Sequence, residues 1–253
     1  MIRSLTADKL KVQIYATRQE MGAAAAVAIA AAIREQIHEK GEVNMIFAAA
    51  PSQQEMLEAL REEPLDWSRV RAFHMDEYIG LPEEAPQRFA RFLHDALFSL
   101  CPFRSVHYIR GDAPDPEAEC RRYSELLEAY PPDTVCLGIG ENGHLAFNDP
   151  PVADFNDPVL VKKVELDPAC RQQQVNDGCF EKLDDVPTHA LTLTIPVLMK
   201  GRKLFCVVPG KTKINAVHDT LYQPASTYYP STILRTHDQA ILFLDQVSAT
   251  LIK

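Results

Sequence analysis

The sequence predicts an α/β fold: a mostly parallel, Rossmann-like sheet with helices on both faces. Strand-like apolar runs alternate with helical segments along the 253 residues. Most of these runs are continuously apolar, which is typical of parallel strands buried on both faces. No linker, repeat or low-complexity tract separates them. We therefore expect residues 1–253 to form a single domain.

The first part of the chain shows this alternation. An alanine-rich segment at 17–39 predicts a long helix, which Gly41 ends. The apolar run 43–50 predicts the first buried strand. Ser52 and Glu55 follow it with the spacing of a capping box, so a second helix is expected to begin there.

The remaining elements continue the pattern. We expect further strands at 70–75, 106–109, 134–137, 159–164, 190–195, 203–208 and 240–245, and helices near 89–97, 115–127, 170–183 and 211–221.

The loop after the strand at 134–137 is the strongest candidate for a functional site. It contains three glycines, Gly138, Gly140 and Gly143, which let the backbone approach a ligand closely. His144 and carboxylates at Glu141 and Asp149 lie in the same loop. Loops at the carboxyl ends of strands are where open α/β sheets bind their ligands.

A second candidate follows the strand at 70–75. Asp76 and Glu77 are adjacent carboxylates at a strand end. Mutual repulsion raises the pKa of one member of such a pair, which would suit a general base near neutral pH.

Together the two loops resemble the glucosamine-6-phosphate deaminase/isomerase family. That family carries Met-Asp-Glu-Tyr-x-Gly-Leu, found here at 75–81, followed by Gly-x-Gly-x-[Asp/Asn]-Gly-His-x-x-Phe-Asn-[Glu/Asp]-Pro, found here at 138–150. The order of strands and helices also matches. The resemblance implies conversion of an amino-sugar 6-phosphate, such as glucosamine 6-phosphate, to fructose 6-phosphate and ammonia.

The resemblance also implies catalytic roles. His144 would open the sugar ring with Asp149 as its carboxylate partner, and Asn142 stands where the family has Asp or Asn. Asp76 would be the base that removes the C2 proton. An imidazole titrating near neutral pH suits ring opening, which moves a proton from the anomeric hydroxyl to the ring oxygen.

For substrate binding, Lys213 matches the phosphate-contacting lysine of the family and begins a helix, where backbone N–H groups favour anions. Further expected substrate-binding residues are Ser52, Glu77, Gly143, Lys162 and Arg171. The loop at 48–54 departs from the family, which has Leu-Pro-Thr-Gly-Gly-Thr-Pro there. Here the loop contains no glycine, so the backbone cannot approach a phosphate as closely.

Two alternatives remain. A 6-phosphogluconolactonase shares the fold but usually has Asp-Glu-Arg where this chain has Asp76-Glu77-Tyr78. A sugar-phosphate sensor domain of a transcription regulator would carry a basic helix-turn-helix segment, and this chain has none.

Composition limits the partners. A net charge of -9 and a pI near 5.4 argue against nucleic acid. The six cysteines show no Cys-x-x-Cys spacing, so we expect reduced thiols, no metal site and no cofactor. Without a signal-peptide core or a membrane-length apolar run, a cytoplasmic protein with no membrane partner is expected. A homo-oligomer is left open.

Overall fold

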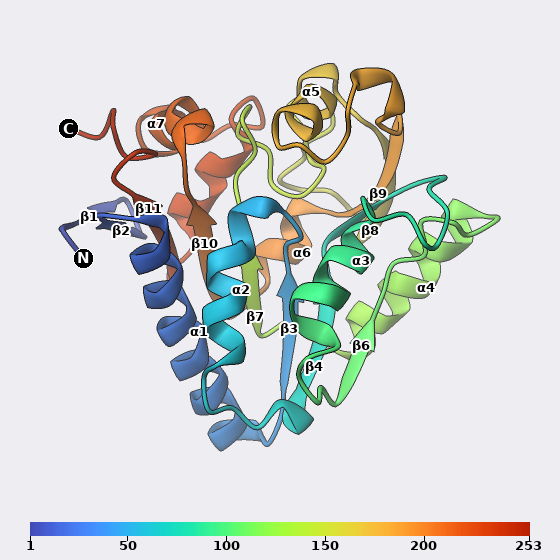
Figure 1. Ribbon diagram of the computed structural model, residues 1–253, viewed down its shortest axis with the longest axis horizontal. Coiled ribbons are helices and arrows are strands. Elements are labelled where there is room, and N and C mark those ends of the chain that lie inside the picture. Colours follow the sequence, from blue (N-terminus) through green and yellow to red (C-terminus); the bar gives the residue numbers. More distant parts are fainter.

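The main sheet has eight strands in the order β1-β2-β11-β10-β7-β3-β4-β6. The computed structural model describes residues 1–253 and shows this sheet between two layers of helices (Figure 1). Only β1 runs antiparallel to its neighbour; the other pairs are parallel. The strands are β1 (Arg3–Ala7), β2 (Leu10–Tyr15), β3 (Val43–Phe47), β4 (Val70–His74), β6 (Ser105–His107), β7 (Thr134–Leu137), β10 (Lys203–Val208) and β11 (Ala240–Asp245).

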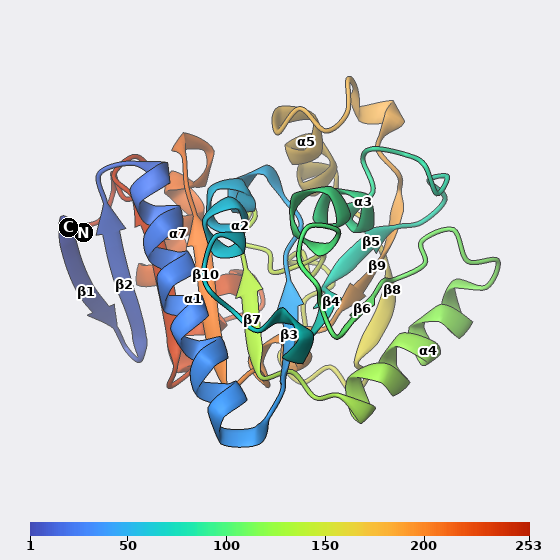
Figure 2. The same ribbon diagram turned by 60° about the horizontal axis from the view of Figure 1, so that its bottom comes forward.

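The central strands are buried on both faces, as their apolar runs predict. Along β10, Phe205 and Val207 face one hydrophobic core, while Leu204 and Cys206 face the other. The first core is covered by α1 (Arg18–Lys40), α2 (Gln54–Arg61) and α3 (Phe89–Leu93), which continues as one π-helical turn (His94–Phe98). The second is covered by α4 (Pro116–Ala129), α6 (Ile195–Met199) and α7 (Ile214–Tyr222). Figure 2 shows α1 and α2 side by side across one face.

The long helix α1 begins and ends at the residues that the sequence indicates. The side chain of Thr17 accepts a hydrogen bond from the backbone N–H of Glu20, and Gly41 takes the left-handed conformation that ends the helix. None of the helices is both long and apolar enough to cross a membrane.

A second, antiparallel sheet differs from the expected pattern. It has the order β5-β9-β8, with β5 (Asp76–Tyr78), β8 (Val161–Glu165) and β9 (His189–Leu193). The runs at 159–164 and 190–195 therefore lie outside the main sheet. Burial alternates along β8, as in a strand with one exposed face. Helix α5 (Pro168–Asn176) precedes β9 and ends earlier than the expected residue 183.

The capping box expected at Ser52 and Glu55 is not formed. A 3₁₀ turn (Pro51–Gln53) precedes α2, and no side chain caps the helix. The carboxylate of Glu55 instead accepts hydrogen bonds of 2.7 and 2.9 Å from the guanidinium of Arg18. This pair ties α2 to α1 and holds the Glu55 carboxylate away from Ser52.

Candidate active site

Four neighbouring strands of the main sheet end at one cleft. Strand β3 leads into residues 48–52, β4 into Asp76, β7 into the glycine loop with His144, and β10 into Lys213. The expected residues Ser52, Asp76, His144 and Lys213 therefore line the same cleft. Its position at the carboxyl ends of parallel strands is the usual one for the site of an open α/β sheet.

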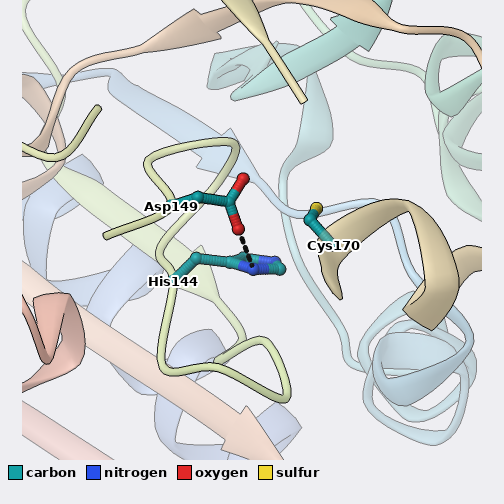
Figure 3. Close-up of side chains that lie close together, drawn as sticks. All are labelled: His144, Asp149 and Cys170. Atoms are coloured by element: carbon teal, nitrogen blue, oxygen red, sulfur yellow. Dashed lines mark ion pairs between the residues drawn. The ribbon is translucent and has the colours of Figure 1, made fainter. Parts of the chain in front are cut away.

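His144, Asp149 and Asn142 form a closed triangle of contacts. Nδ1 of His144 lies 3.0 Å from Oδ1 of Asp149 and 2.8 Å from Oδ1 of Asn142. Nδ2 of Asn142 donates to Oδ1 of Asp149 at 2.8 Å. Because both oxygens facing Nδ1 are acceptors, we assign the ring proton to Nδ1, and this leaves Nε2 to exchange a proton with a ligand. Figure 3 shows the imidazole beside the carboxylate.

The backbone of the loop makes room for this ring. A Cβ at Gly140 would lie 2.1–2.3 Å from Cε1, Nδ1 and Nε2 of His144, so only glycine fits. Ala146, which also lines the cleft, has a φ of 49°. Such strain in a residue other than glycine is common at functional sites.

The environment of Asp149 keeps its carboxylate ionised. Burial alone would raise its pKa, but attraction to His144 and hydrogen bonds from His144, Asn142 and Cys170 bring the pKa below its ordinary value. Burial and the neighbouring Asp149 raise the pKa of the Cys170 thiol well above its usual range.

The donor atoms of His144, Asp149 and Cys170 lie within 4.8 Å of one another, which makes them the group to consider as metal ligands. The thiol of Cys170 is engaged in a hydrogen bond with Asp149. Nδ1 of His144 is also already engaged with Asp149 and Asn142. The donor set therefore suits proton transfer better than metal binding.

Asp76 sits where the chain leaves the main sheet for the second one. It is 7% exposed and lines the cleft. Burial, and next the charge of Glu77, raise the pKa of Asp76 well above its usual value. A carboxylate that holds a proton more strongly than usual is suited to act as a general base.

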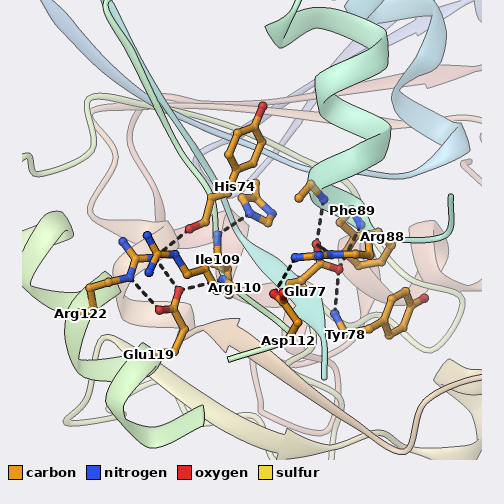
Figure 4. A network of polar contacts seen from close by, with 12 residues as sticks. His74, Glu77, Tyr78, Arg88, Phe89, Ile109, Arg110, Asp112, Glu119 and Arg122 are labelled. Atoms are coloured by element: carbon orange, nitrogen blue, oxygen red, sulfur yellow. Dashed lines mark hydrogen bonds and ion pairs between the residues drawn. The ribbon is translucent and has the colours of Figure 1, made fainter. Parts of the chain in front are cut away.

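Glu77, which was expected to contact the substrate, does not line the cleft. Strand alternation turns it to the opposite side of β5 from Asp76. Its carboxylate accepts hydrogen bonds from the backbone N–H groups of Tyr78, Phe89 and Ala90, and lies 3.7 Å from Nε of Arg88 (Figure 4). Burial raises its pKa to about 7, against these hydrogen bonds and Arg88.

Three other expected binding residues also lie outside the cleft lining. The ammonium of Lys162 donates to the carbonyl of Val152 and to Asp157, at 2.7 and 2.8 Å. Arg171 donates to the carbonyls of Leu183 and Val186. Both therefore hold loops together.

The third is Gly143, which has a φ of 84° and accepts a hydrogen bond from the N–H of Ser231. It shapes the glycine loop instead.

Lys213 remains the candidate anion anchor. It is 5% exposed, and its ammonium has no hydrogen-bond or ion-pair partner within the protein. Burial lowers its pKa, and the nearby charges of Asp177 and Glu141 oppose that effect. An isolated, nearly buried cation in a cleft is a site for an anion.

The side chain of Gln53 ties the glycine-free loop at 48–54 to strand β10. Gln53 is fully buried, and its Nε2 donates to the carbonyl of Val207 at the end of β10 and to Oγ of Ser52. This amide joins the ends of β3 and β10 at the cleft.

Three cleft residues were missed from the sequence: Gln173, Gln174 and Asp177, from α5 and the residue that follows it. The segment was expected to be a polar helix, and its contact with the substrate was assigned to Arg171. Their spacing puts these three side chains on one side of a helix, which is the signal that could have identified them.

The fold and cleft define an α/β enzyme that presents an imidazole–carboxylate pair, a separate buried carboxylate and a lysine at the carboxyl edge of its sheet. The chain belongs to the family of glucosamine-6-phosphate isomerases and 6-phosphogluconolactonases, whose family model matches residues 16–243.

Two similar relatives are glucosamine-6-phosphate deaminases. The one from Exiguobacterium sp. is 37% identical over 219 residues, covering 86% of this chain and 84% of the relative. The one from Bacillus cereus is also 37% identical, covering 87% of this chain and 82% of the relative.

Solved structures agree on the fold. A structure described as a monomeric glucosamine-6-phosphate deaminase is similar with a TM-score of 0.86 at 28% identity, covering 95% of this chain and 99% of the other. The 6-phosphogluconolactonase from Thermotoga maritima has a TM-score of 0.77 at 21% identity, covering 94% of this chain and 100% of the other, and shares the fold.

Proposed function

We propose that this protein converts an amino-sugar 6-phosphate, glucosamine 6-phosphate in the first instance, to fructose 6-phosphate and ammonia. The observation that carries the proposal is the placement of Asp76, the His144–Asp149 pair and Lys213 around one cleft. The family membership and the deaminase relatives support the same reaction.

His144 acts first, on the cyclic hemiacetal. Nε2 takes the proton of the anomeric hydroxyl, and the protonated ring returns a proton to the ring oxygen as the C1–O bond to that oxygen breaks. Asp149, ionised and in contact with Nδ1, stabilises the imidazolium that forms between these transfers.

Asp76 acts next, on the open-chain aldehyde. It removes the C2 proton while O1 takes a proton from solvent, which gives an enol bearing the amino group. Protonation of this enol at C1 then gives the C2 imine. Water adds to this imine and ammonia leaves, which gives the ketose. Asp76 suits this step because its raised pKa makes it a stronger base than an exposed carboxylate.

Lys213 holds the phosphate in this proposal, and Ser52 and the N-terminal turn before α7 lie beside it as further donors. A cytoplasmic location and the lack of a nucleic-acid partner stay predictions, and whether the protein forms a homo-oligomer is left open.

The test is ammonia release from purified protein with glucosamine 6-phosphate, galactosamine 6-phosphate, glucose 6-phosphate and 6-phosphogluconolactone. The proposal predicts ammonia and a ketose phosphate from a hexosamine 6-phosphate, and no lactone hydrolysis. Lactone hydrolysis without ammonia release would support the lactonase alternative. Binding of a hexosamine 6-phosphate without turnover would support a sensor.

A further inference from the structure

The α5 face of the cleft carries polar side chains with different partners. Gln173 is fully engaged: its Oε1 accepts from the N–H of Glu141 at 2.7 Å, and its Nε2 donates to Oδ2 of Asp177 at 3.3 Å. Gln173 therefore joins the glycine loop to Asp177 and fixes one oxygen of that carboxylate. Asp177 itself lines the cleft and has no cationic partner within ion-pair distance.

Gln174 is the unexplained group. It is 6% exposed and lines the cleft, and its side-chain amide makes no hydrogen bond within the protein, although its backbone carbonyl accepts from the N–H of Cys179. The amide of Gln174 is therefore free to hydrogen-bond to a ligand in the cleft.

The charges at this end of the cleft are unusual for an anion site. Lys213 is the only lysine or arginine of the cleft lining, and Asp177 lies in the same lining. Glu141 and Asp177 both act electrostatically on Lys213. A dianion beside Lys213 would thus also face carboxylates, which repel it.

We propose that Asp177 and Gln174 are specificity-determining residues that, with Lys213, bind the substrate phosphate as its monoanion and reject a sulfate ester. The P–OH group donates to the free oxygen of Asp177, the Gln174 amide donates to a second phosphate oxygen, and Lys213 balances the charge. This inference rests on the proposed function, because it concerns the phosphate of the same substrate.

A phosphate ester and a sulfate ester differ in whether they carry a proton near neutral pH. A phosphate monoester has a second pKa of about 6, so it has a proton to share near neutral pH. Selecting the monoanion at pH 7 costs about tenfold in apparent affinity. A sulfate ester has no such proton, so each approach to Asp177 brings two negative oxygens together.

Gln173 donates to Oδ2 of Asp177, and Oδ1 accepts no hydrogen bond from the protein. Lys213 is a cation and Glu141 a carboxylate. Cys179, whose thiol pKa is raised to about 11 by burial and by Asp177, stays neutral. Asp177 remains the group that distinguishes a protonated oxyanion from an unprotonated one.

The test compares inorganic phosphate with inorganic sulfate by calorimetric titration of the 253-residue protein at pH 6.5. Because this measurement needs no turnover, it can fail or succeed independently of ammonia release. The parent should bind phosphate at least about tenfold more tightly than sulfate. In Asp177→Asn the ratio should fall toward one, because an amide can donate to either anion.

Two further variants complete the design. Asp184→Asn removes the same charge from an exposed position in the following segment and should keep the parent ratio. Gln174→Leu should weaken both anions and leave their ratio unchanged. The proposal is overturned if the parent does not prefer phosphate, or if Asp177→Asn keeps the preference of the parent.

Discussion

The imidazole of His144 lies against Gly140 so closely that a Cβ at residue 140 would come within 2.1 Å of its Cε1. The ring occupies the space that a side chain at residue 140 would fill, and its Nδ1 is held by Asp149. With Nδ1 engaged in this way, Nε2 is the nitrogen left to act on a ligand in the cleft.

Gly140→Ala should therefore displace the ring while leaving the sheet intact. Misplacement of a catalytic group by about 1 Å can cost on the order of a hundredfold in rate. We expect a loss of kcat of that order, with a Tm close to that of the parent. Parent-like kcat would show that the position of the ring does not limit the reaction.

His144→Gln tests ring opening. The variant should be slow on the cyclic substrate yet bind a linear amino-hexitol 6-phosphate nearly as well as the parent, since the linear form has no ring to open. Affinity by calorimetry and thermal melting are measured together. Loss of both linear-analogue affinity and Tm would make His144 a structural residue of the loop.

Glu77→Gln should change the pH dependence of kcat/KM. Asp76 must be ionised to accept a proton, so activity falls as the pH drops through its pKa. Burial and, as the second cause, the charge of Glu77 raise that pKa. Its removal should lower the pKa, move the acid limb to lower pH, and reduce the plateau rate because the base is weaker.

Asp112→Asn is the matched control, because Asp112 pairs with the same Arg88 without adjoining Asp76. Its acid limb should match that of the parent. If Glu77→Gln is folded, as judged by its Tm, and its acid limb lies at the same pH as in the parent, then Glu77 does not raise the pKa of Asp76.

Lys213→Ala should raise KM far more than it lowers kcat, because a phosphate anchor binds the ground and transition states alike. The loss of a charged hydrogen bond predicts an increase of roughly ten- to a hundredfold. Lys211→Ala, an exposed neighbour in the same turn, should behave like the parent. Equal effects of the two variants would contradict the assignment.

The sequence predicted the main sheet well because its strands are continuously apolar and its loops contain glycine and proline. Helix α1 with its end at Gly41 and the parallel strands β3, β4, β7, β10 and β11 are confirmed. The hairpin β1–β2 was missed because β1 is short and mostly polar. The second sheet was missed because pairing partners such as Asp76 and Thr192 are distant in sequence.

The site was predictable where a motif fixes it and not where packing decides it. His144, Asn142 and Asp149 come from one loop, so their contact is local. Whether a side chain of this segment reaches the cleft depends on the direction in which it points. Arg171 turns away to donate to two carbonyls, while Gln174 and Asp177 line the cleft. Residue type alone favoured the arginine.

The most direct test of the account is solvent exchange at the reacting carbons in Asp76→Asn. In D₂O, NMR should show the parent incorporating deuterium into the sugar phosphate during turnover. The variant should show none, while binding the linear analogue within a few-fold of the parent. Loss of a general base typically lowers the rate by about 10²–10⁴-fold. Exchange in Asp76→Asn at the rate of the parent would contradict the assignment of Asp76 as the base.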